Sequence, residues 1–274
     1  MIRQNLHTHS EWDDGANTLE EMAQAAISAG LTSLGFSVHS YMPFPSFWTI
    51  EEARIPDYTR AVHRLRNEFE GTLAIYHGAE WDTLSKMPLD GYDYVIGSIH
   101  HIQARGQGSC VDNTPEMTKQ YIAELFDGSA DAAAEAYFAQ YEALAKVEKV
   151  GIVGHFDLLT KFDETDHFYD ADSPRFRAAA LNAMDALVAA NKVFEINTGA
   201  ISRGYRKMPY PSRTLLKELG RRKARITVSA DAHAASDVAF GFAEAEALAI
   251  DCGFTEVWQF DGRGFVPVSI GGGG

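Results

Sequence analysis

Cysteine is nearly absent from this sequence, with only Cys110 and Cys252 among 274 residues. Two cysteines without CxxC spacing are too few for a disulfide scaffold and are typical of a cytosolic protein. The first ten residues, MIRQNLHTHS, lack the apolar segment of a signal peptide, and no apolar run is long enough to cross a bilayer. We therefore expect a cytoplasmic chain without a membrane segment.

Positive charge is also scarce. The chain has 24 Lys and Arg against 38 Asp and Glu, which gives a formal net charge of −14. Such a charge repels polyanions and lacks the basic surface of nucleic-acid-binding proteins, so DNA and RNA are not expected partners. A small phosphorylated substrate remains compatible with it, because local cations in a pocket outweigh a distant negative surface.

The sequence contains no fixed-period repeat, proline-rich linker or low-complexity tract that would divide it into domains. With 46% hydrophobic residues it has ample material for one core. We expect a single domain over residues 1–270, with the GGGG tail excluded from the fold and the oligomeric state left open.

Short apolar runs alternate with helical patterns along the chain. The runs expected to form buried parallel strands are Ile2–Leu6, Leu31–Ser37, Leu73–Ala79, Tyr92–Ile99, Val150–Gly154, Lys192–Asn197 and Arg225–Ala230, with one further short strand at Glu256–Phe260. Helix starts are indicated by the capping box Thr18–Glu21 and by Thr114 and Ser173, each of which precedes a proline. Seven strand–helix repeats predict an α/β fold with a parallel sheet, either open or closed into a barrel.

Histidines and carboxylates follow the predicted strands. These residues are His7, His9, Asp14, His39, Glu80, His100, His155, Asp231 and His233. In a closed parallel barrel the carboxyl ends of the strands meet on one face, where functional residues are found. Imidazoles and carboxylates together suit zinc, manganese or iron, and this set is too large for one ion. We expect two or three divalent metals, with Glu80 and Asp231 as the best bridges.

The remaining histidines are expected to play no part in this site. His63 lies within a helix, His77 points to the wrong face of its strand, and His167 lies in an acidic loop. Only one member of the consecutive pair His100 and His101 can face inward, so His101 is also left out.

The motifs HTHS…DG, SVHS, GAEWD, YVIGSIHH, GHFDLL, FEINTGA and SADAH, in this order, resemble the PHP (polymerase and histidinol phosphatase) superfamily, with the histidinol-phosphate phosphatase branch as the nearest match. The resemblance covers nearly the whole chain. It implies a distorted (β/α)7 TIM-like barrel with a two- or three-metal centre that hydrolyses phosphoesters.

The resemblance also implies how the metals are divided. His7, His9, Glu80 and Asp231 would hold one metal; Glu80, His100 and His155 would hold the second; Asp14, His39 and His233 would hold the third. Asp231 and His233 thereby count as catalytic residues. Asp157 is a candidate proton donor for the departing alkoxide, with a role as hydrogen-bond partner to the metal ligands left open.

Four further residues are expected to contact the substrate. The segment Glu195–Ser212 resembles the family's phosphate-binding loop, in which a guanidinium fork suits phosphate oxygens. The candidates are Arg203 first, then Arg206, together with Asn197 and Lys161. Relatives often have glycine at the position of Ala200 and arginine near Lys161, and Glu195 could orient a ligand or form a salt bridge.

The expected reaction is hydrolysis of L-histidinol phosphate to L-histidinol and phosphate, in histidine biosynthesis, by a metal-activated hydroxide. Three alternatives remain: a PHP phosphoesterase for another small phosphate ester or nucleotide, a metal-dependent amidohydrolase, and a non-catalytic metal-binding domain. The amidohydrolase type often needs a bridging lysine after the fourth strand, and YDYVIGSIHH offers none. For the cationic end of histidinol, the candidates in the early loops are Trp12, Asp13, Tyr41, Phe44 and Trp48.

Overall fold

The structure is a computed structural model that describes residues 2–271. Its central feature is a parallel sheet of seven strands in the order β1-β2-β3-β4-β7-β8-β9. The strands are β1 (Gln4–Asn5), β2 (Ser33–His39), β3 (Ala74–Asp82), β4 (Tyr94–Ser98), β7 (Ile152–Val153), β8 (Val193–Asn197) and β9 (Arg225–Ser229). A parallel bridge between Thr8 and Ala232 joins the two edges, so the sheet is nearly closed into a distorted (β/α)7 barrel. The closed alternative of the sequence analysis is thereby confirmed.

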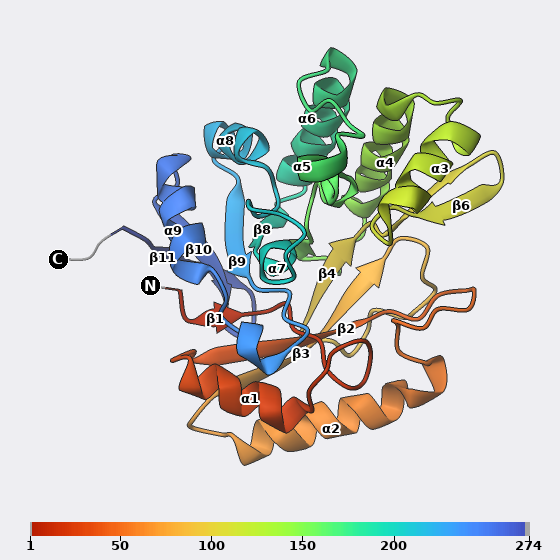
Figure 1. Ribbon diagram of the computed structural model, residues 1–274. Coiled ribbons are helices and arrows are strands. Elements are labelled where there is room, and N and C mark those ends of the chain that lie inside the picture. Colours follow the sequence, from red (N-terminus) through yellow and green to blue (C-terminus); the bar gives the residue numbers. More distant parts are fainter. Residues whose placement is uncertain (1, 272–274) are drawn as a thin grey trace.

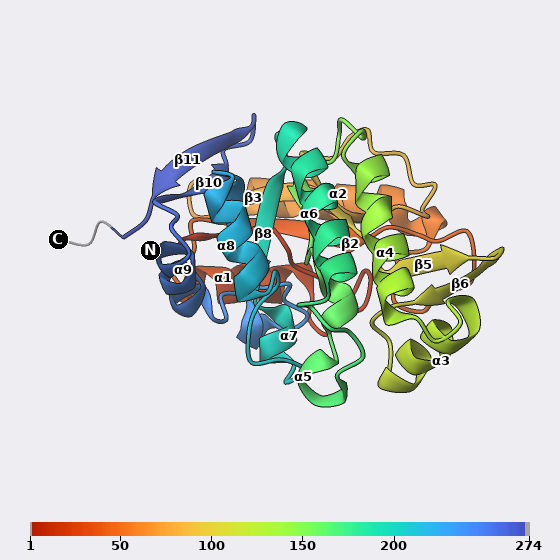
Figure 2. The same cartoon turned by 90° about the horizontal axis from the view of Figure 1, so that it is seen from above.

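Helices cover the outside of the barrel. They are α1 (Leu19–Ser28), α2 (Ile55–Glu68), α3 (Pro115–Leu125), α4 (Ala130–Leu144), α5 (Asp163–Asp166), α6 (Pro174–Ala189), α7 (Gly199–Ser202), α8 (Arg213–Arg221) and α9 (Phe242–Asp251). Three short 3-10 helices lie at Glu52–Arg54, Leu158–Thr160 and Ala235–Asp237. In Figure 1, α1 and α2 lie on one side of the strands, and the view of Figure 2 shows α8, α6 and α4 across the other side.

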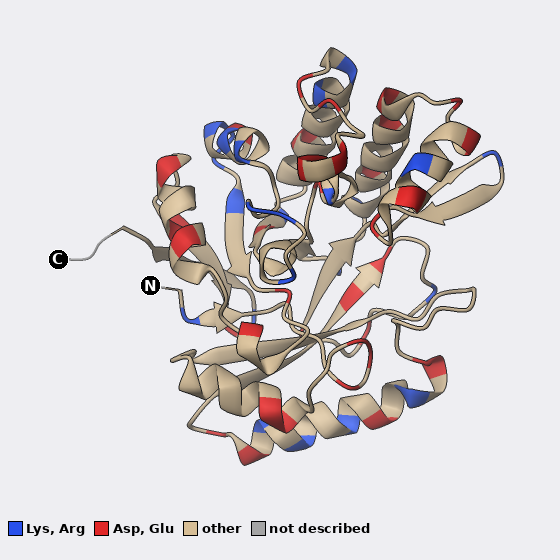
Figure 3. Ribbon diagram, viewed as in Figure 1, with Lys and Arg blue, Asp and Glu red and all other residues tan. Residues whose placement is uncertain are grey.

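The helix starts follow the predicted capping chemistry. Thr18 caps α1 through a capping box with Glu21, and Thr114 and Ser173 each accept a backbone N–H at the start of α3 and α6, with proline at the first position. Opposite charges are mixed along α2, as Figure 3 shows, which suits a helix with one face in solvent.

Tyr94 packs in a buried cluster with Leu6, Ile96, Ile152 and Phe260. The Tyr94 hydroxyl donates to the Leu6 carbonyl at 2.5 Å. A Cβ atom at Gly35 or Gly78 would meet the Tyr94 ring at 2.3 and 2.2 Å, so these glycines make the room that the ring occupies. The Tyr94 side chain therefore packs between β2, β3 and the segment that follows β1.

The apolar pattern of the sequence did not predict two antiparallel hairpins. One pairs β5 (His101–Ala104) with β6 (Gln107–Cys110), and the other pairs the expected β10 (Glu256–Phe260) with β11 (Phe265–Ser269). Arg105 and Gly106, at the tip of the first hairpin, have φ of 56° and 75°, the left-handed turn that a two-residue hairpin needs. Phe260 of the second hairpin packs in a cluster with Leu6 and Tyr94.

Two further expectations concern the extent of the domain and the lack of a membrane segment. The predicted domain boundary 1–270 stays a prediction, and Met1 and the last three glycines of the GGGG tail lie outside the described residues. Among residues 2–271, no helix combines the length and apolar character that a membrane crossing requires.

Candidate metal centre

The structure brings all nine predicted metal-binding side chains together on one face of the barrel. They form four overlapping groups whose candidate ligand atoms lie within 4.8 Å of one another: His7, Glu80 and His155; His7, His9 and Asp231; His39, Glu80 and His100; and His9, Asp14, His39 and His233. The parallel strands explain this convergence, because their carboxyl ends meet at one end of the barrel. Their role as metal ligands stays a prediction.

Glu80 lies at the centre of the cluster. Its Oε1 is 2.8 Å from His155 Nε2 and 3.3 Å from His100 Nε2. Its Oε2 is 3.2 Å from His7 Nε2. A fully buried carboxylate with imidazoles at both oxygens has the geometry of a bridging ligand.

Unpartnered atoms in this cluster fit a metal. The Nε2 atoms of His7 and His9 and the Oε2 atom of Glu80 are buried and have no hydrogen-bond partner. Buried polar atoms are normally satisfied, and an exception calls for a missing ion or water. Imidazole nitrogen and carboxylate oxygen are the donors that divalent transition metals take in proteins. The donor set therefore fits the predicted metals.

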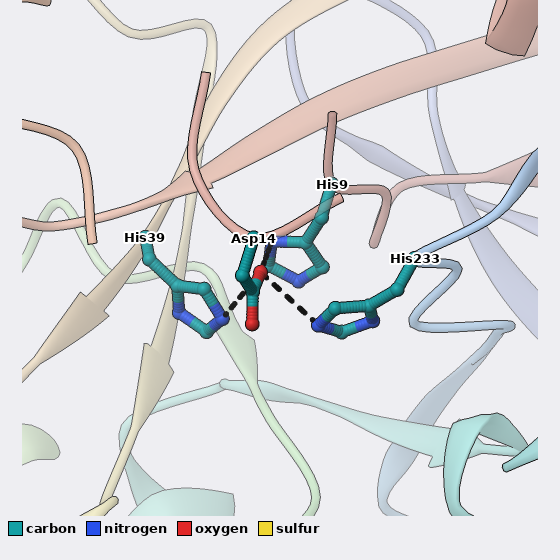
Figure 4. Close-up of side chains that lie close together, drawn as sticks. All are labelled: His9, Asp14, His39 and His233. Carbon is teal, nitrogen blue, oxygen red and sulfur yellow. Dashed lines mark ion pairs between the residues drawn. The ribbon is translucent and has the colours of Figure 1, made fainter. Parts of the chain in front are cut away.

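A second part of the cluster surrounds Asp14, as Figure 4 shows. Its Oδ1 atom is 3.2 Å from His233 Nε2 and 3.6 Å from His39 Nε2. The His9 and His39 rings stack with centroids 4.2 Å apart. Asp14 is the most exposed of these ligand candidates, with 30% of its side chain accessible, so this group forms the outer edge of the centre.

Three buried carboxylates lie beside the Nδ1 atoms of histidines in the cluster. The Nδ1 atom of His7 is 2.9 Å from Glu195, that of His9 is 2.6 Å from Asp13, and that of His100 is 3.5 Å from Asp82. Asp82 also accepts the His100 backbone N–H at 2.9 Å. Such partners fix the tautomer and leave Nε2 free to face a metal.

Sequence reasoning considered only one of these three carboxylates, Glu195, in this role. It missed Asp82 and placed Asp13 among the candidate contacts of the substrate's cationic end. Asp13 is instead fully buried against His9, and its Oδ2 atom also accepts the His39 backbone N–H at 2.9 Å. The position of Asp13 four residues after His9 was the available signal.

The charged groups of the cluster shift one another's pKa values. Burial lowers the pKa of His9, but the hydrogen-bonded Asp13 carboxylate outweighs this effect and raises it to about 10. Burial raises the pKa of Glu80, but His7, His39 and His100 lower it well below its ordinary value. Without metal, His9 therefore keeps a proton beside charged carboxylates, and a metal that binds at His9 must displace this proton.

Asp231 adopts a strained backbone conformation. Its φ of 47° lies in the left-handed region, which costs a non-glycine residue on the order of 1–3 kcal/mol. A Cβ atom at Gly199 would lie 2.8 Å from the Asp231 Cβ atom, so glycine is required there for the close approach. This conformation turns the carboxylate toward His7 and His9, whose Nε2 atoms lie 3.5 and 3.3 Å from Oδ1.

A cavity of about 280 Å³ opens above the cluster. Besides seven of the ligand candidates, its wall includes Phe47, Trp48, Cys110, Asp112, Asn113, Leu158, Lys161, Arg203 and Tyr205. Arg203 donates to the Asp231 carboxylate at 3.2 Å and to the Asp231 carbonyl at 3.0 Å. Two of the four predicted substrate contacts, Arg203 and Lys161, thus line the cavity above the cluster.

The other two predicted substrate contacts lie behind the wall. Arg206 is buried and donates to the Thr160 carbonyl and hydroxyl at 3.1 and 2.6 Å. Asn197 is fully buried and donates to Glu195 at 2.7 Å and to Asp231 at 3.3 Å. Both side chains are occupied by protein partners, so they support the loop and the ligands and do not face a substrate.

Asp157 is the predicted proton donor. Its carboxylate is buried away from the cavity wall, and Oδ2 accepts the Ser212 backbone N–H at 2.9 Å. A proton donor must reach the departing oxygen directly or through one water. Asp157 is placed to hold the loop before α8, and its role as proton donor stays a prediction.

The excluded histidines lie away from the cluster, as expected. His77 stacks on Tyr92 with centroids 4.6 Å apart, and its Nδ1 atom donates to the Gly91 carbonyl at 3.2 Å. His101 contacts Asp82 and stacks on Trp48. His63 and His167 are exposed.

A barrel with this donor set at the carboxyl ends of its strands, below a cavity lined by arginine and lysine, defines a metal-dependent hydrolase of phosphate esters. The PHP domain model matches residues 5–199. The chain belongs to the PHP domain family, as its sequence motifs indicated.

The relatives point to one branch of the family. A protein named "Probable histidinol-phosphatase" from Deinococcus radiodurans is 30% identical over 241 residues, which cover 83% of this chain and 85% of the relative. The histidinol-phosphatase of Bacillus subtilis is 26% identical over 266 residues, covering 88% of this chain and 97% of the relative. The solved histidinol phosphate phosphatase of Lactococcus lactis has the same fold, with a TM-score of 0.75 and 22% identity over 96% of this chain and 98% of that chain.

Proposed function

We propose that this chain is a phosphomonoesterase that hydrolyses L-histidinol phosphate to L-histidinol and phosphate with divalent transition metals. The observation that carries the proposal is the placement of Arg203 and Lys161 on the cavity wall above the cluster of histidines and carboxylates. The relatives named above support the substrate, since two carry histidinol-phosphatase names. The Lactococcus lactis protein was solved with zinc, L-histidinol and phosphate.

The residues that would hold the metals belong to the four groups of the cluster, divided among the ions as the family resemblance implies. His7, His9 and Asp231 would hold one ion, His100 and His155 another, and Asp14, His39 and His233 a third, with Glu80 shared. We propose zinc, manganese or iron, the metals that match these donors. When bound, they supply a lowered pKa for a coordinated water and neutralise charge on the phosphoryl group.

The chain's own residues orient the reacting groups. The Arg203 guanidinium presents N–H donors over Asp231, in a position to pair with phosphoryl oxygens that gain charge during the reaction. Lys161 supplies a second cation on the same wall. Glu195 and Asn197 keep His7 and Asp231 in place from below.

The experiment that tests the substrate compares kcat/KM for L-histidinol phosphate with that for glycerol phosphate, on protein supplied with zinc, manganese or iron. The proposal predicts at least a tenfold preference for histidinol phosphate, equivalent to about 1.4 kcal/mol of transition-state binding. A smaller preference would leave a phosphatase without this substrate. Nucleoside monophosphates in the same panel test the alternative of a nucleotide phosphoesterase.

A further inference from the structure

Asp112 is an acidic residue on the cavity wall whose role the proposed reaction does not explain. It lies between β6 and α3, and its side chain lines the same cavity as His100, His155 and Arg203. About 21% of the side chain is accessible. A carboxylate beside a site that receives a phosphate dianion opposes substrate binding by charge repulsion.

In the structure, Asp112 is paired with the second cation of the wall. Lys161 Nζ donates to the Asp112 carbonyl at 2.7 Å and to Oδ2 at 3.2 Å. The Cys110 thiol donates to Oδ1 at 3.1 Å. Burial raises the pKa of Asp112, but the Lys161 ammonium, His100 and the Cys110 thiol together outweigh burial and hold the pKa below its ordinary value, so the carboxylate is charged.

The rest of the wall favours a flat organic cation. Phe47, Trp48 and Tyr205 line the cavity, and Phe47 is 90% exposed. Lys161 Nζ lies 4.5 Å from the centre of the Tyr205 ring, which shows that this ring already accepts a cation. Aromatic faces attract ammonium and imidazolium groups by their quadrupoles.

We propose that Asp112 is a specificity-determining residue that binds the ammonium group of the substrate's alcohol half. On binding, Lys161 exchanges its carboxylate partner for a phosphoryl oxygen, and the substrate's ammonium group takes the place of Lys161 on Asp112. The exchange keeps every charge in the cavity paired, which a phosphate ester of a neutral alcohol cannot do. This inference rests on the proposed function, because it requires a substrate with both an anionic and a cationic end.

The variant that tests this inference is Asp112→Asn, which removes the charge and keeps the shape. We expect kcat/KM for L-histidinol phosphate to fall tenfold to a hundredfold, the scale of a lost charge-assisted contact. For glycerol phosphate we expect a change of less than about threefold, since that ester has no ammonium group to lose. Inhibition of glycerol phosphate hydrolysis by L-histidinol should weaken at least tenfold in parallel.

Glu116→Gln is the matched control, because Glu116 is exposed on α3 four residues further along the chain. It should leave both substrates unchanged. Lys161→Met should lower kcat/KM for both substrates, because both carry the phosphate that Lys161 would bind. Asp112→Ala replaces the asparagine variant if the latter does not fold, as judged by its thermal melting curve.

The outcomes separate this inference from the proposed function. If the wild-type chain shows no preference for histidinol phosphate, both fail together. If the wild type shows the preference and Asp112→Asn retains it, only the role of Asp112 is overturned. An equal loss on both substrates would mean that Asp112 acts only by positioning Lys161, which also contradicts the inference.

Discussion

His155 Nε2 lies 2.8 Å from Oε1 of Glu80, although 75 residues separate them in the chain. His7 Nε2 lies 3.2 Å from the other oxygen of the same carboxylate. Glu80 therefore joins two groups of histidines that come from distant parts of the sequence. An ion held by either of these two groups would have Glu80 as a ligand. Glu80 is therefore the central residue of the proposed metal centre.

Replacing Glu80 with glutamine should weaken two metals at once, because the bridge loses its charge while its size is kept. We expect the metal content per chain to fall by more than one equivalent, measured by elemental analysis after loading with metal and dialysis. The control is His77→Gln, since His77 lies on the same strand and faces Tyr92. Equal losses in the two variants would contradict the assigned faces of β3.

Most of the ligand cluster could be predicted because it depends on strand ends. His39, Glu80 and His155 follow or end apolar runs, and a parallel barrel brings such positions together whatever the loops do. The alternation of side chains along β3 likewise predicted that His77 and Glu80 face opposite sides.

The supporting residues could not be predicted in the same way. Whether a carboxylate such as Asp13 or Asp112 faces the substrate or another side chain depends on loop conformation and rotamers, which leave no periodic signal in the sequence. For the same reason, Arg206 could not be distinguished from Arg203: both are arginines of one loop, and only the fold gives Arg206 the Thr160 carbonyl as a partner.

Asp13→Asn should weaken metal binding without removing a ligand. The variant loses the charge that orients and polarises His9 through a 2.6 Å contact, and loss of such an outer partner typically costs 10- to 100-fold in metal affinity or activity. Competition with a chelator of known affinity measures the change. An unchanged affinity would show that His9 is oriented without Asp13, and exposed Glu11 serves as the control when changed to Gln.

Arg203→Ala should lower kcat/KM by roughly tenfold to a thousandfold, the scale of a lost charge-assisted contact in the transition state. Metal content should not fall, because Arg203 is a cation that contacts Asp231 and is not itself a metal ligand. Steady-state kinetics and elemental analysis on the same preparation measure both quantities. A loss of metal that accounts for the loss of activity would place Arg203 among the structural supports of the centre.

His77 should make the fold sensitive to acid. Burial lowers its pKa from 6.5 to about 4, so the unfolded chain takes up a proton at a higher pH than the folded chain does. The stability that neutral His77 contributes is complete above pH 6.5 and falls as the pH drops, by about 2 kcal/mol at pH 5.

His77→Gln should therefore reduce the difference in free energy of unfolding between pH 7 and pH 5, as measured by urea denaturation. Exposed His167, which lies outside the His77 environment and is changed to Asn, is the matched control and should leave the difference unchanged. The same pH dependence in wild type and in His77→Gln would show that His77 does not titrate in this range.

The most direct test of the account is a metal titration of activity on L-histidinol phosphate. Protein stripped of metal by a chelator, and verified as metal-free, is supplied with increasing equivalents of zinc, manganese or iron while phosphate release is followed. The account predicts no turnover without metal and a rise that saturates only at two or more equivalents per chain, because Glu80 joins at least two sites. Full activity in the metal-free protein, or saturation at one equivalent, would contradict it.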